Sequence, residues 1–438
     1  MSWARTILTA YRWTGAAAYP FIGTYVAWRT AKGKEDNSRR RERYGITGRR
    51  RPAGPLVWVH AASVGETNAV VPLIERILES DINVVLTTGT ITSAKVAEAR
   101  LGRRIIHQYV PLDLKPAVSN FLNHWMPDLA IIAESEIWPM TILELGARRV
   151  PQVLVNGRLS DRSYASWKKR AFLAEAIFEN LAHVVAQTEI DAERFTSLGA
   201  RPVTVSGNLK VDTNPPHANE HALAVLKRQI GMRRSWAAVS THDGEEAIAG
   251  EVHGLIKSRH PGLLTIIVPR HPERAEAIVK VLAAQGLKVA RRSLDEPVKS
   301  DTDVLLGDTI GEMGLYLRLT EIAFVGRSLT AEGGQNPIEP AMLNTAVLAG
   351  LNVNNFREAY QKLIDSGGAK LVKDRDMLAG AVNFLLNNPA ARRDMIAAGV
   401  ATVEDMRGAL DRTIRALDPF IQPLMVKSRL RNGSESHS

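Results

Sequence analysis

The chain has 438 residues, 45% of them hydrophobic, which is enough for two packed α/β domains of about 150–200 residues each. It has no cysteine, which excludes disulfides, thiolate metal sites and a thiol nucleophile, and it has no His-x-x-x-His or His-Glu-x-x-His run, so no metal is expected. The net charge is +10, and ten Lys and Arg against three acids between Arg29 and Arg51 account for +7 of it.

The basic segment follows an apolar one. Trp13 to Trp28 carries no charge and is rich in Trp and Tyr, which favour the membrane interface, although Pro20 interrupts it and it is shorter than the roughly 20 residues of a spanning helix. Because cations after an apolar segment stay in the cytoplasm and attract anionic lipid, we predict an uncleaved anchor with a basic collar over residues 1–51, on the cytoplasmic side of a membrane. The alternative is a first helix docked on a soluble domain.

Two consequences follow from this interpretation of the N-terminus. A chain that begins near Pro52 is expected to fold without the anchor. The basic run also lacks the interleaved aromatic residues and the motifs of nucleic-acid-binding proteins, so no nucleic-acid partner is expected.

The first half alternates short apolar runs with amphipathic stretches, which is the β-α-β pattern of a doubly wound sheet. We predict a Rossmann-like domain over residues 52–213, and Thr213–His217, with two prolines, indicates a linker. The predicted strands are Leu56–His60, Val84–Thr87, Ile105–Val110, Leu129–Ala133, Val153–Asn156, Val184–Gln187 and Val203–Ser206.

Ser63-Val64-Gly65-Glu66 lies on the turn from the first strand to a helix, at the sheet edge where open α/β sheets bind ligands. Two interpretations of Glu66 stay open on spacing alone. Ser-x-x-Glu before an apolar run is a helix-capping pattern. A carboxylate next to a glycine at such an edge is also suited to act as a general base.

Three further loops of this half carry polar side chains. Glu134 and Glu136 follow a strand, and they serve either as helix-start acids or as part of a site at the same edge as Glu66. Arg158 and Arg162 lie in a loop suited to a phosphate or carboxylate. Lys210 is expected to lie near the end of the domain, although a lone Lys is usually solvated.

The second half repeats the alternation over residues 214–420 and ends in a polar tail, 421–438, that is expected to be disordered. A long amphipathic helical region is predicted after Met377. The predicted strands are Ala237–Ser240, Leu264–Val268, Lys288–Ala290, Val304–Leu306, Ile322–Val325, Val347–Gly350 and Lys370–Val372.

Two loops of the second half suit an anion. Pro269 and Pro272 stiffen a turn that presents Arg270 and His271. A Gly-Gly loop at 333–334 leads into a helix opened by Pro337, whose amides favour phosphate, with Glu339 able to accept sugar hydroxyls. Asp301-Thr302-Asp303 resembles a metal motif but precedes a strand, which places it on the opposite edge.

In chain order, these motifs resemble the 3-deoxy-D-manno-octulosonic acid (Kdo) transferase family, over about Tyr11 to Arg357 including the N-terminal segment. The matching motifs are SVGE (63–66), TTGT (87–90), PLD (111–113), ESEIWP (134–139), NGRLSDRS (156–163), GNLKVD (207–212), STHDGEE (240–246), PRHPER (269–274), GE (311–312), FVGRSL (324–329) and GGQNPIEPA (333–341).

The resemblance implies a GT-B fold of two Rossmann-like domains, acceptor domain first and CMP-sugar domain second, with the active site between them. It implies an inverting, metal-independent transfer of Kdo from CMP-Kdo to the lipid A precursor (lipid IVA) in lipopolysaccharide biosynthesis, without a cofactor. The lipid acceptor and the N-terminal anchor together imply that the protein is located on the cytoplasmic side of the inner membrane. They also imply that the anionic lipids of this membrane are a partner.

The resemblance also assigns roles to residues. Glu66 is implied as the general base, with Glu136 and Lys210 supporting the transition state. Arg158 or Arg162 is a candidate for the carboxylate of the sugar. The implied CMP-binding positions are Pro269, Arg270, Gly311, Glu312, Met313, Asn336, Pro337, Ile338 and Glu339.

Two departures from the family pattern lie near the donor positions. The chain has Gln335 where the family usually has His, and Gly350–Phe356 lacks the Pro and His common there. Two other functions therefore compete with Kdo transfer: a GT-B glycosyltransferase that uses another nucleotide sugar, and a catalytically silent membrane-bound protein that binds lipid or nucleotide.

Overall fold

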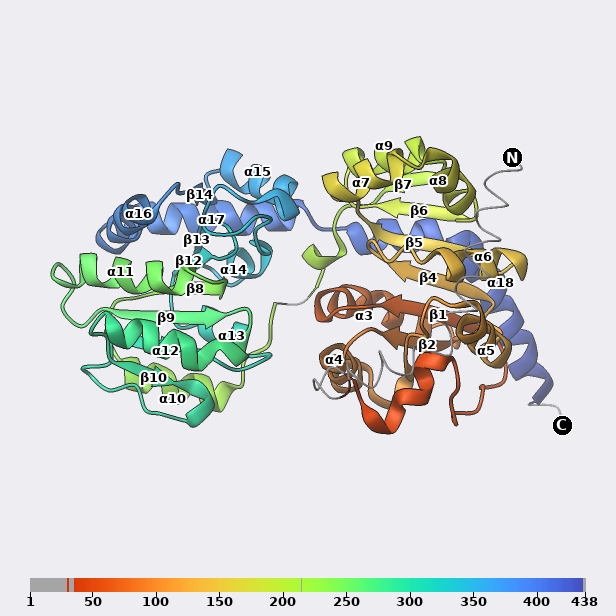
Figure 1. The fold of residues 1–438 in the computed structure, drawn as a ribbon, viewed down its shortest axis with the longest axis horizontal. Coiled ribbons are helices and arrows are strands. Elements are labelled where there is room, and N and C mark those ends of the chain that lie inside the picture. Colours follow the sequence, from red (N-terminus) through yellow and green to blue (C-terminus); the bar gives the residue numbers. More distant parts are fainter. Residues whose placement is uncertain (1–29, 31–34, 214, 436–438) are drawn as a thin grey trace. The chain divides into compact units, whose positions relative to one another are not determined.

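The computed structural model describes residue 30 and residues 35–213 and 215–435 of the chain. It divides into two compact units (Figure 1). Unit 1 comprises residues 1–213 and 407–438, and unit 2 comprises residues 214–406. Each unit is built on its own seven-stranded parallel sheet with helices on both faces.

The sheet of unit 1 has the strand order β3-β2-β1-β4-β5-β6-β7, and all of its pairings are parallel. All seven strands predicted for this half are present, with ends within one residue of those expected. They are β1 (Leu56–Ala61), β2 (Asn83–Thr88), β3 (Ile106–Tyr109), β4 (Leu129–Ala133), β5 (Gln152–Gly157), β6 (His183–Ala186) and β7 (Val203–Val205).

Side chains of β1 alternate between two cores, as the pleat of a strand requires. Val57 and Val59 pack with helices on one face, whereas Trp58 packs on the other face against Phe121 and Trp125. The helices of this unit are α3 (Val64–Leu78), α4 (Ile91–Leu101), α5 (Lys115–Trp125), α6 (Pro139–Ala147), α7 (Asp161–Lys168), α8 (Ala171–Phe178), α9 (Glu189–Ser197) and α18 (Ala409–Glu435), with 3-10 turns η2 (Asn37–Tyr44), η3 (Gly102–Arg104) and η4 (Leu209–Val211).

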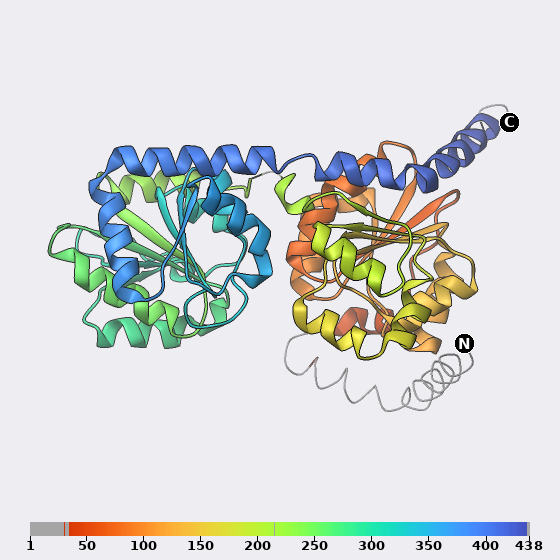
Figure 2. The same ribbon diagram turned by 90° about the horizontal axis from the view of Figure 1, so that it is seen from above.

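The end of the chain differs from the sequence prediction. Residues 421–435 are not a disordered tail, because α18 (Ala409–Glu435) runs through them, and residues from Arg407 onward belong to unit 1 rather than to the second domain. Leu417, Ile421 and Leu424 lie in the core beside the helices of the first sheet, so burial of this apolar face holds the helix there. Figure 2 shows α18 running along one side of unit 1.

The sheet of unit 2 has the strand order β10-β11-β9-β8-β12-β13-β14, again entirely parallel. All seven predicted strands are present. They are β8 (Ser235–Thr241), β9 (Leu264–Pro269), β10 (Val289–Arg291), β11 (Val304–Leu306), β12 (Ile322–Val325), β13 (Ala346–Ala349) and β14 (Ala369–Leu371).

The helices of unit 2 cover both faces of this sheet (Figure 1). They are α10 (Glu220–Ile230), α11 (Glu245–Lys257), α12 (Ala275–Ala284), α13 (Met313–Leu317), α14 (Ile338–Met342), α15 (Arg357–Asp365), α16 (Arg375–Asn387) and α17 (Pro389–Asp405), with 3-10 turns η5 (Pro272–Arg274), η6 (Arg292–Leu294) and η7 (Asn354–Phe356). The helical region predicted after Met377 is thus divided among α16, α17 and α18.

The basic segment before the first strand is partly built into unit 1. Arg43 is buried; its Nε donates to Glu35 at 2.8 Å, and its Nη2 donates to the Gly89 carbonyl at 2.7 Å. Arg39 binds the His107 carbonyl, and Arg51 binds the Trp125 carbonyl. A chain beginning at Pro52 would lose these contacts, so a start at or upstream of Glu35 is better suited than Pro52 to a test of the N-terminal segment.

The uncharged segment Trp13–Trp28 lies outside the described residues, and so does most of the predicted anchor. Among the residues that the structure does describe, none of the helices combines the length and the apolar character needed to cross a membrane.

Candidate active site

Glu66 lies in the first turn of α3, after β1, and is largely buried. Ser63 caps the helix, and its Oγ donates to Glu66 Oε1 at 2.7 Å, while the Ala62 amide donates to Oε2 at 2.8 Å. The capping interpretation is therefore correct as geometry. This geometry does not exclude a chemical role for Glu66, because the two donors also fix the orientation of the carboxylate, as a general base requires.

The electrostatics around Glu66 favour a base. Burial raises the pKa of its carboxyl, and the negative charges of Glu134 and Glu136 raise it further, against the lowering effect of the Ser63 hydrogen bond. Buried carboxylates with like-charged neighbours are a common means of bringing a general base towards neutral pH.

Glu134 follows β4 directly and is held by groups from two other elements. Lys210 Nζ on η4 lies 2.5 Å from Glu134 Oε1, and Asn156 Nδ2 on β5 lies 3.3 Å from the same oxygen. Lys210 also lies against Gly65, where an added Cβ would be 3.8 Å from Lys210 Cε. Lys210 is therefore a fixed counter-charge beside the turn that carries Glu66, and not a solvated surface lysine.

Glu136 accepts a hydrogen bond of 2.7 Å from Trp138 Nε1, and its Oε2 lies 3.6 Å from His60 Nε2 on β1. Burial acts to raise the pKa of Glu136, but the nearby imidazole of His60 and the hydrogen bond from Trp138 outweigh it, and the net result is a lowered pKa. Glu66 and Glu136 are thus shifted in opposite directions, which is typical of carboxylates with different roles in one site.

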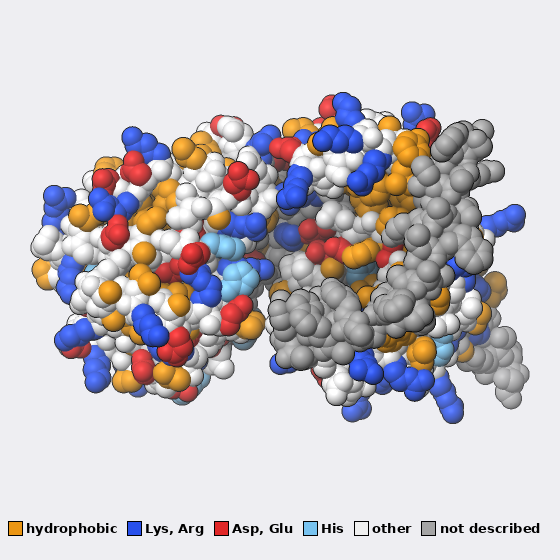
Figure 3. Space-filling model, in the orientation of Figure 1, with side chains coloured by type: hydrophobic (Ala, Val, Ile, Leu, Met, Phe, Trp, Pro, Cys, Tyr) orange, Lys and Arg blue, Asp and Glu red, His pale blue; other side chains and the backbone are white. Residues whose placement is uncertain are grey.

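The three carboxylates lie where the strand order of unit 1 reverses. β1 and β4 are neighbours in the sheet, but the chain leaves them on opposite sides, so Glu66 and the pair Glu134 and Glu136 meet at the topological switch point. Figure 3 shows acidic side chains gathered on one part of this unit. The sequence predicted this edge correctly.

The two predicted arginines differ in placement. Arg158 begins the loop after β5, and its amide lies 3.4 Å from the Glu134 carbonyl, so its backbone adjoins the carboxylate cluster. Arg162 is exposed on α7, one turn further along the chain.

Unit 2 has its switch point between β8 and β12, and polar side chains gather there as well (Figure 3). His242 follows β8, and its Nε2 lies 3.2 Å from Gln335 Nε2. Burial lowers the pKa of His242, and the nearby cations Arg327 and Arg270 lower it further. Because these groups meet at one edge, they form a basic environment suited to a phosphate.

Pro269 ends β9, and the amide of the exposed Arg270 donates to the Thr241 carbonyl at 3.0 Å, which ties this turn to β8. Gly311 has φ +85, which favours glycine, and Glu312 and Met313 start the short helix α13. Glu312 is already bound by Thr309 and Arg292, so its side chain braces the loop.

The segment from Asn336 to Glu339 forms the start of α14. Asn336 Oδ1 accepts the Ile338 amide at 3.1 Å, and the side chains of Pro337 and Ile338 are buried, whereas Glu339 is half-buried. Pro337 is the N-cap of a helix only five residues long. Of these four predicted positions, Asn336 and Glu339 therefore have the more accessible side chains.

Sequence reasoning missed Glu245. This buried carboxylate at the start of α11 accepts the amides of Arg327, Ser328 and Leu329 at 2.6–3.0 Å, and it fixes the loop after β12. Its neighbour Glu246 pairs with Arg274 at 2.9 Å. The local signal was the pair of acids in His-Asp-Gly-Glu-Glu directly after a strand, a pattern typical of a helix start, and it does not indicate which loop the acids hold.

Backbone strain marks the same positions. Glu134 and Asn156 in unit 1 and Ser240 and Arg327 in unit 2 have positive φ angles of 53–56°, which are rare for residues with side chains. Glu134, Ser240 and Arg327 lie at the ends of β4, β8 and β12, which border the two switch points, and Asn156 lies near the end of the next strand, β5. Such strain concentrates at functional sites, where surrounding contacts hold it in place.

Other candidate features lie elsewhere. Asp303 precedes β11 and binds Lys257 and His253, so the Asp-x-Asp motif serves the fold at the opposite sheet edge, as predicted.

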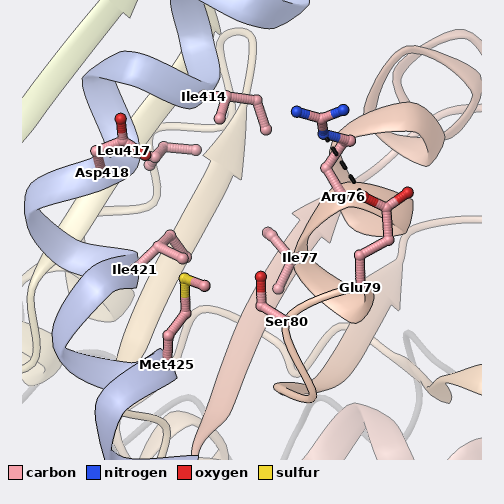
Figure 4. A pocket seen from close by; sticks show the side chains of 9 residues that line it. All are labelled: Arg76, Ile77, Glu79, Ser80, Ile414, Leu417, Asp418, Ile421 and Met425. Carbon is pink, nitrogen blue, oxygen red and sulfur yellow. Dashed lines mark ion pairs between the residues drawn. The ribbon is translucent and has the colours of Figure 1, made fainter.

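A pocket of about 140 Å³ in unit 1 lies between α3 and α18 and is lined by Arg76, Ile77 and Met425 among others (Figure 4). It contains none of the candidate residues and is smaller than the roughly 300–1,000 Å³ of ligand sites.

Comparisons with known proteins agree with these placements. Residues 38–213 match the family model described as 3-deoxy-D-manno-octulosonic-acid transferase (kdotransferase). The chain is 33% identical over 413 residues to 3-deoxy-D-manno-octulosonic acid transferase of Haemophilus influenzae, covering 92% of this chain and 96% of that one. It is 36% identical over 395 residues to the enzyme of the same name from Bordetella pertussis, covering 86% and 91%.

The fold is shared with more distant proteins. A glycosyltransferase from Rickettsia africae has a TM-score of 0.60 at 12% identity, covering 84% of this chain and 99% of that one. The structural similarity concerns the fold alone, whereas the sequence similarity to the two transferases extends over most of the chain. The chain therefore belongs to the 3-deoxy-D-manno-octulosonic acid transferase family.

Proposed function

We propose that this Kdo transferase moves Kdo from CMP-Kdo to a hydroxyl of the lipid A precursor, lipid IVA, with inversion and with Glu66 as the general base. The observation that carries the proposal is the carboxylate cluster at the first switch point, where Glu66 has a raised pKa and fixed orientation. The basic edge around His242 on unit 2 is the proposed site of the CMP phosphate.

The chemistry assigns a task to each group. Glu66 takes the proton of the acceptor hydroxyl while that oxygen forms a bond to the anomeric carbon of Kdo. The bond from this carbon to the CMP phosphate oxygen breaks, and the phosphate leaves with the electron pair. The proposal assigns Arg270 to stabilise the departing charge, and it assigns Lys210 and Glu136 to support the transition state. Arg158 or Arg162 would hold the sugar carboxylate.

The donor is tested by mass spectrometry of lipid A precursor after incubation with enzyme and CMP-Kdo, compared with UDP-sugars. We expect a product heavier by Kdo from CMP-Kdo alone. Transfer from a UDP-sugar would instead favour the alternative glycosyltransferase, for which Gln335 offers a structural reason because it lies beside His242. Binding of CMP without any transfer would favour a silent protein.

We also propose that the N-terminal segment brings the enzyme to the cytoplasmic face of the inner membrane. The support is the uncharged Trp13–Trp28 sequence and four exposed cations in the described part of the collar, Arg40, Arg41, Arg49 and Arg50. Arg39, Arg43 and Arg51 bind backbone carbonyls of unit 1, so they contribute to the fold as well.

Replacing Arg40, Arg41, Arg49 and Arg50 by Ser is expected to weaken sedimentation with anionic vesicles, most strongly at low salt, because each cation near such a surface contributes about 1 kcal/mol. A chain that begins at Glu35 keeps the Glu35–Arg43 pair and is expected to fold, to bind CMP, and to leave the vesicle pellet.

The matched control replaces Lys168, Lys169 and Arg170, an exposed basic run between α7 and α8, by Ser. Its sedimentation should equal that of the wild type. If the chain beginning at Glu35 still pellets fully at high salt, membrane contact resides on the folded units and not in the N-terminal segment.

A further inference from the structure

His60 is a buried imidazole with one ring nitrogen that has no hydrogen-bond partner. It lies on β1 and is 2% exposed. Its Nδ1 lies 2.9 Å from Thr87 Oγ1, whereas Nε2 has no partner within hydrogen-bond distance. An unpaired buried polar atom costs about 1–3 kcal/mol, so its presence calls for a reason beyond packing.

The surroundings of His60 set the position of its proton. Trp58 Nε1 donates to one lone pair of Thr87 Oγ1 at 2.9 Å, and the hydroxyl hydrogen of Thr87 can then be donated to His60 Nδ1. In that arrangement Nε2 carries the ring hydrogen. If Nδ1 instead donates to the Thr87 carbonyl at 3.1 Å, Nε2 can face an anion favourably only when it too is protonated.

The group that Nε2 faces is the carboxylate of Glu136, with Oε2 at 3.6 Å. This separation is slightly longer than a hydrogen bond, and contacts of catalytic groups are often long before substrate binds. Among the residues that the structure describes, the other side-chain donor to Glu136 is the indole of Trp138, at 2.7 Å. The two donors approach the carboxylate from different elements, β1 and the segment before α6.

We infer that His60 is a positioning residue for Glu136, whose carboxylate it orients through Nε2–H, while Thr87 holds the other ring nitrogen. The inference deepens the proposed function, since it rests on Glu136 supporting the transfer. His60 itself touches no reacting atom.

Other charged groups face the same carboxylate cluster. Glu66 on α3 and Glu134 after β4 are the like charges, and Lys210 on η4 is the counter-charge bound to Glu134. Asp113 caps α6 through the Met140 and Thr141 amides. Within the described part of the chain, Lys210 pairs with Glu134, and the basic side chain that lies beside Glu136 is His60.

Removing His60 therefore has a defined consequence for pH dependence. Burial acts to raise the pKa of Glu136, and His60 opposes it. Without the His60 donor the pKa of Glu136 rises, so the carboxylate becomes protonated at a higher pH, and the acid limb of the turnover profile moves to higher pH.

The test compares His60→Leu, which removes the donor, with His60→Gln, whose amide N–H reaches about the position of Nε2. For His60→Leu we expect kcat at neutral pH to fall about tenfold, because Glu136 loses a donor that orients its carboxylate, and we expect the acid limb to move to higher pH, because a hydrogen bond to the charged form of a carboxyl favours that form. The KM for CMP-Kdo should stay near the wild-type value. His60→Gln should recover most of the loss.

His183→Leu is the matched control, since His183 lies at the opposite end of the same sheet, at the start of β6. Its profile should equal that of the wild type. In a Glu136→Gln background, His60→Leu should cost no further activity, because the group it acts through is gone. Equal losses for Leu and Gln at position 60, or an unmoved acid limb, would overturn the inference.

A readout without turnover separates this inference from the proposed function. Carboxyl-carbon NMR of Glu-labelled protein, with Glu136→Gln identifying the signal, should show Glu136 titrating at a higher pH in His60→Leu than in the wild type. An unchanged titration overturns the inference whatever the activity. Absence of Kdo transfer by the wild type would contradict the proposed function and leave this titration to decide the role of His60.

Discussion

Glu66→Gln is expected to lower Kdo-transfer turnover by about 10²-fold or more, because it removes the only proton acceptor that the proposed mechanism assigns to the acceptor hydroxyl. The side chain keeps its size, and its oxygen can still accept the Ala62 amide, as Glu66 Oε2 does. The measurement is turnover at saturating CMP-Kdo with acceptor in detergent. CMP affinity should be unchanged, since the proposed CMP contacts lie on unit 2.

Stability separates the two interpretations of Glu66. Its pKa is raised by burial and by Glu134 and Glu136, so the stability it contributes is present at low pH and is lost as pH rises through the raised pKa. At neutral pH the neutral Gln relieves this repulsion, and the thermal midpoint should be equal to or above that of the wild type.

Ser63→Ala is the matched control for helix capping. It removes the hydroxyl that caps α3 and binds Glu66 Oε1, which should cost about 1 kcal/mol of stability while retaining the carboxylate. Turnover near the wild-type value in Glu66→Gln, together with a lowered thermal midpoint, would show that Glu66 is a cap and that the base is another residue.

Arg270→Ala is expected to weaken CMP binding by about 1.5–3 kcal/mol, the range for a hydrogen bond to a charged group, or roughly 10- to 150-fold in Kd. The side chain is exposed at the end of β9, and the amide tie to Thr241 does not depend on it. Titration calorimetry with CMP is the measurement, and the fold should be retained.

Arg259→Ala provides the control for a lost surface cation. Arg259 is exposed in the loop between α11 and β9, at the opposite edge of the same sheet, and CMP affinity should not change on its removal. An unchanged affinity in Arg270→Ala would move the proposed phosphate site away from this turn. Equal losses in both variants would indicate a general effect of charge on an anionic ligand.

Local sequence decided the strands and the edge at which the polar groups gather. Buried parallel strands are continuous apolar runs, so Leu129–Ala133 and Ile322–Val325 are predicted to the residue. A polar residue directly after such a run lies at the carboxyl edge of the sheet, which places Glu66, Glu134 and Arg270 without knowledge of the fold.

The spacing of residues along the chain does not predict a side-chain contact when the two partners come from elements that are distant in the sequence. Nothing local to Lys210 predicts that it pairs with Glu134, and nothing local to Glu245 predicts that it holds the loop at 327–329. The same holds for His60, whose neighbour Glu136 follows a strand about 70 residues later in the chain. Such pairs depend on strand order, which a single sequence does not specify.

The sequence by itself determined the parallel α/β class, the fourteen strands and the family, because each depends on apolar runs or on ordered short motifs. Only the tertiary structure decided that α18 returns to unit 1, that Arg43 is buried with Glu35, and that Glu66 and Glu136 have pKa values shifted in opposite directions. Burial and charge pairing are properties of neighbours in space, and packing brings together residues that the chain keeps far apart.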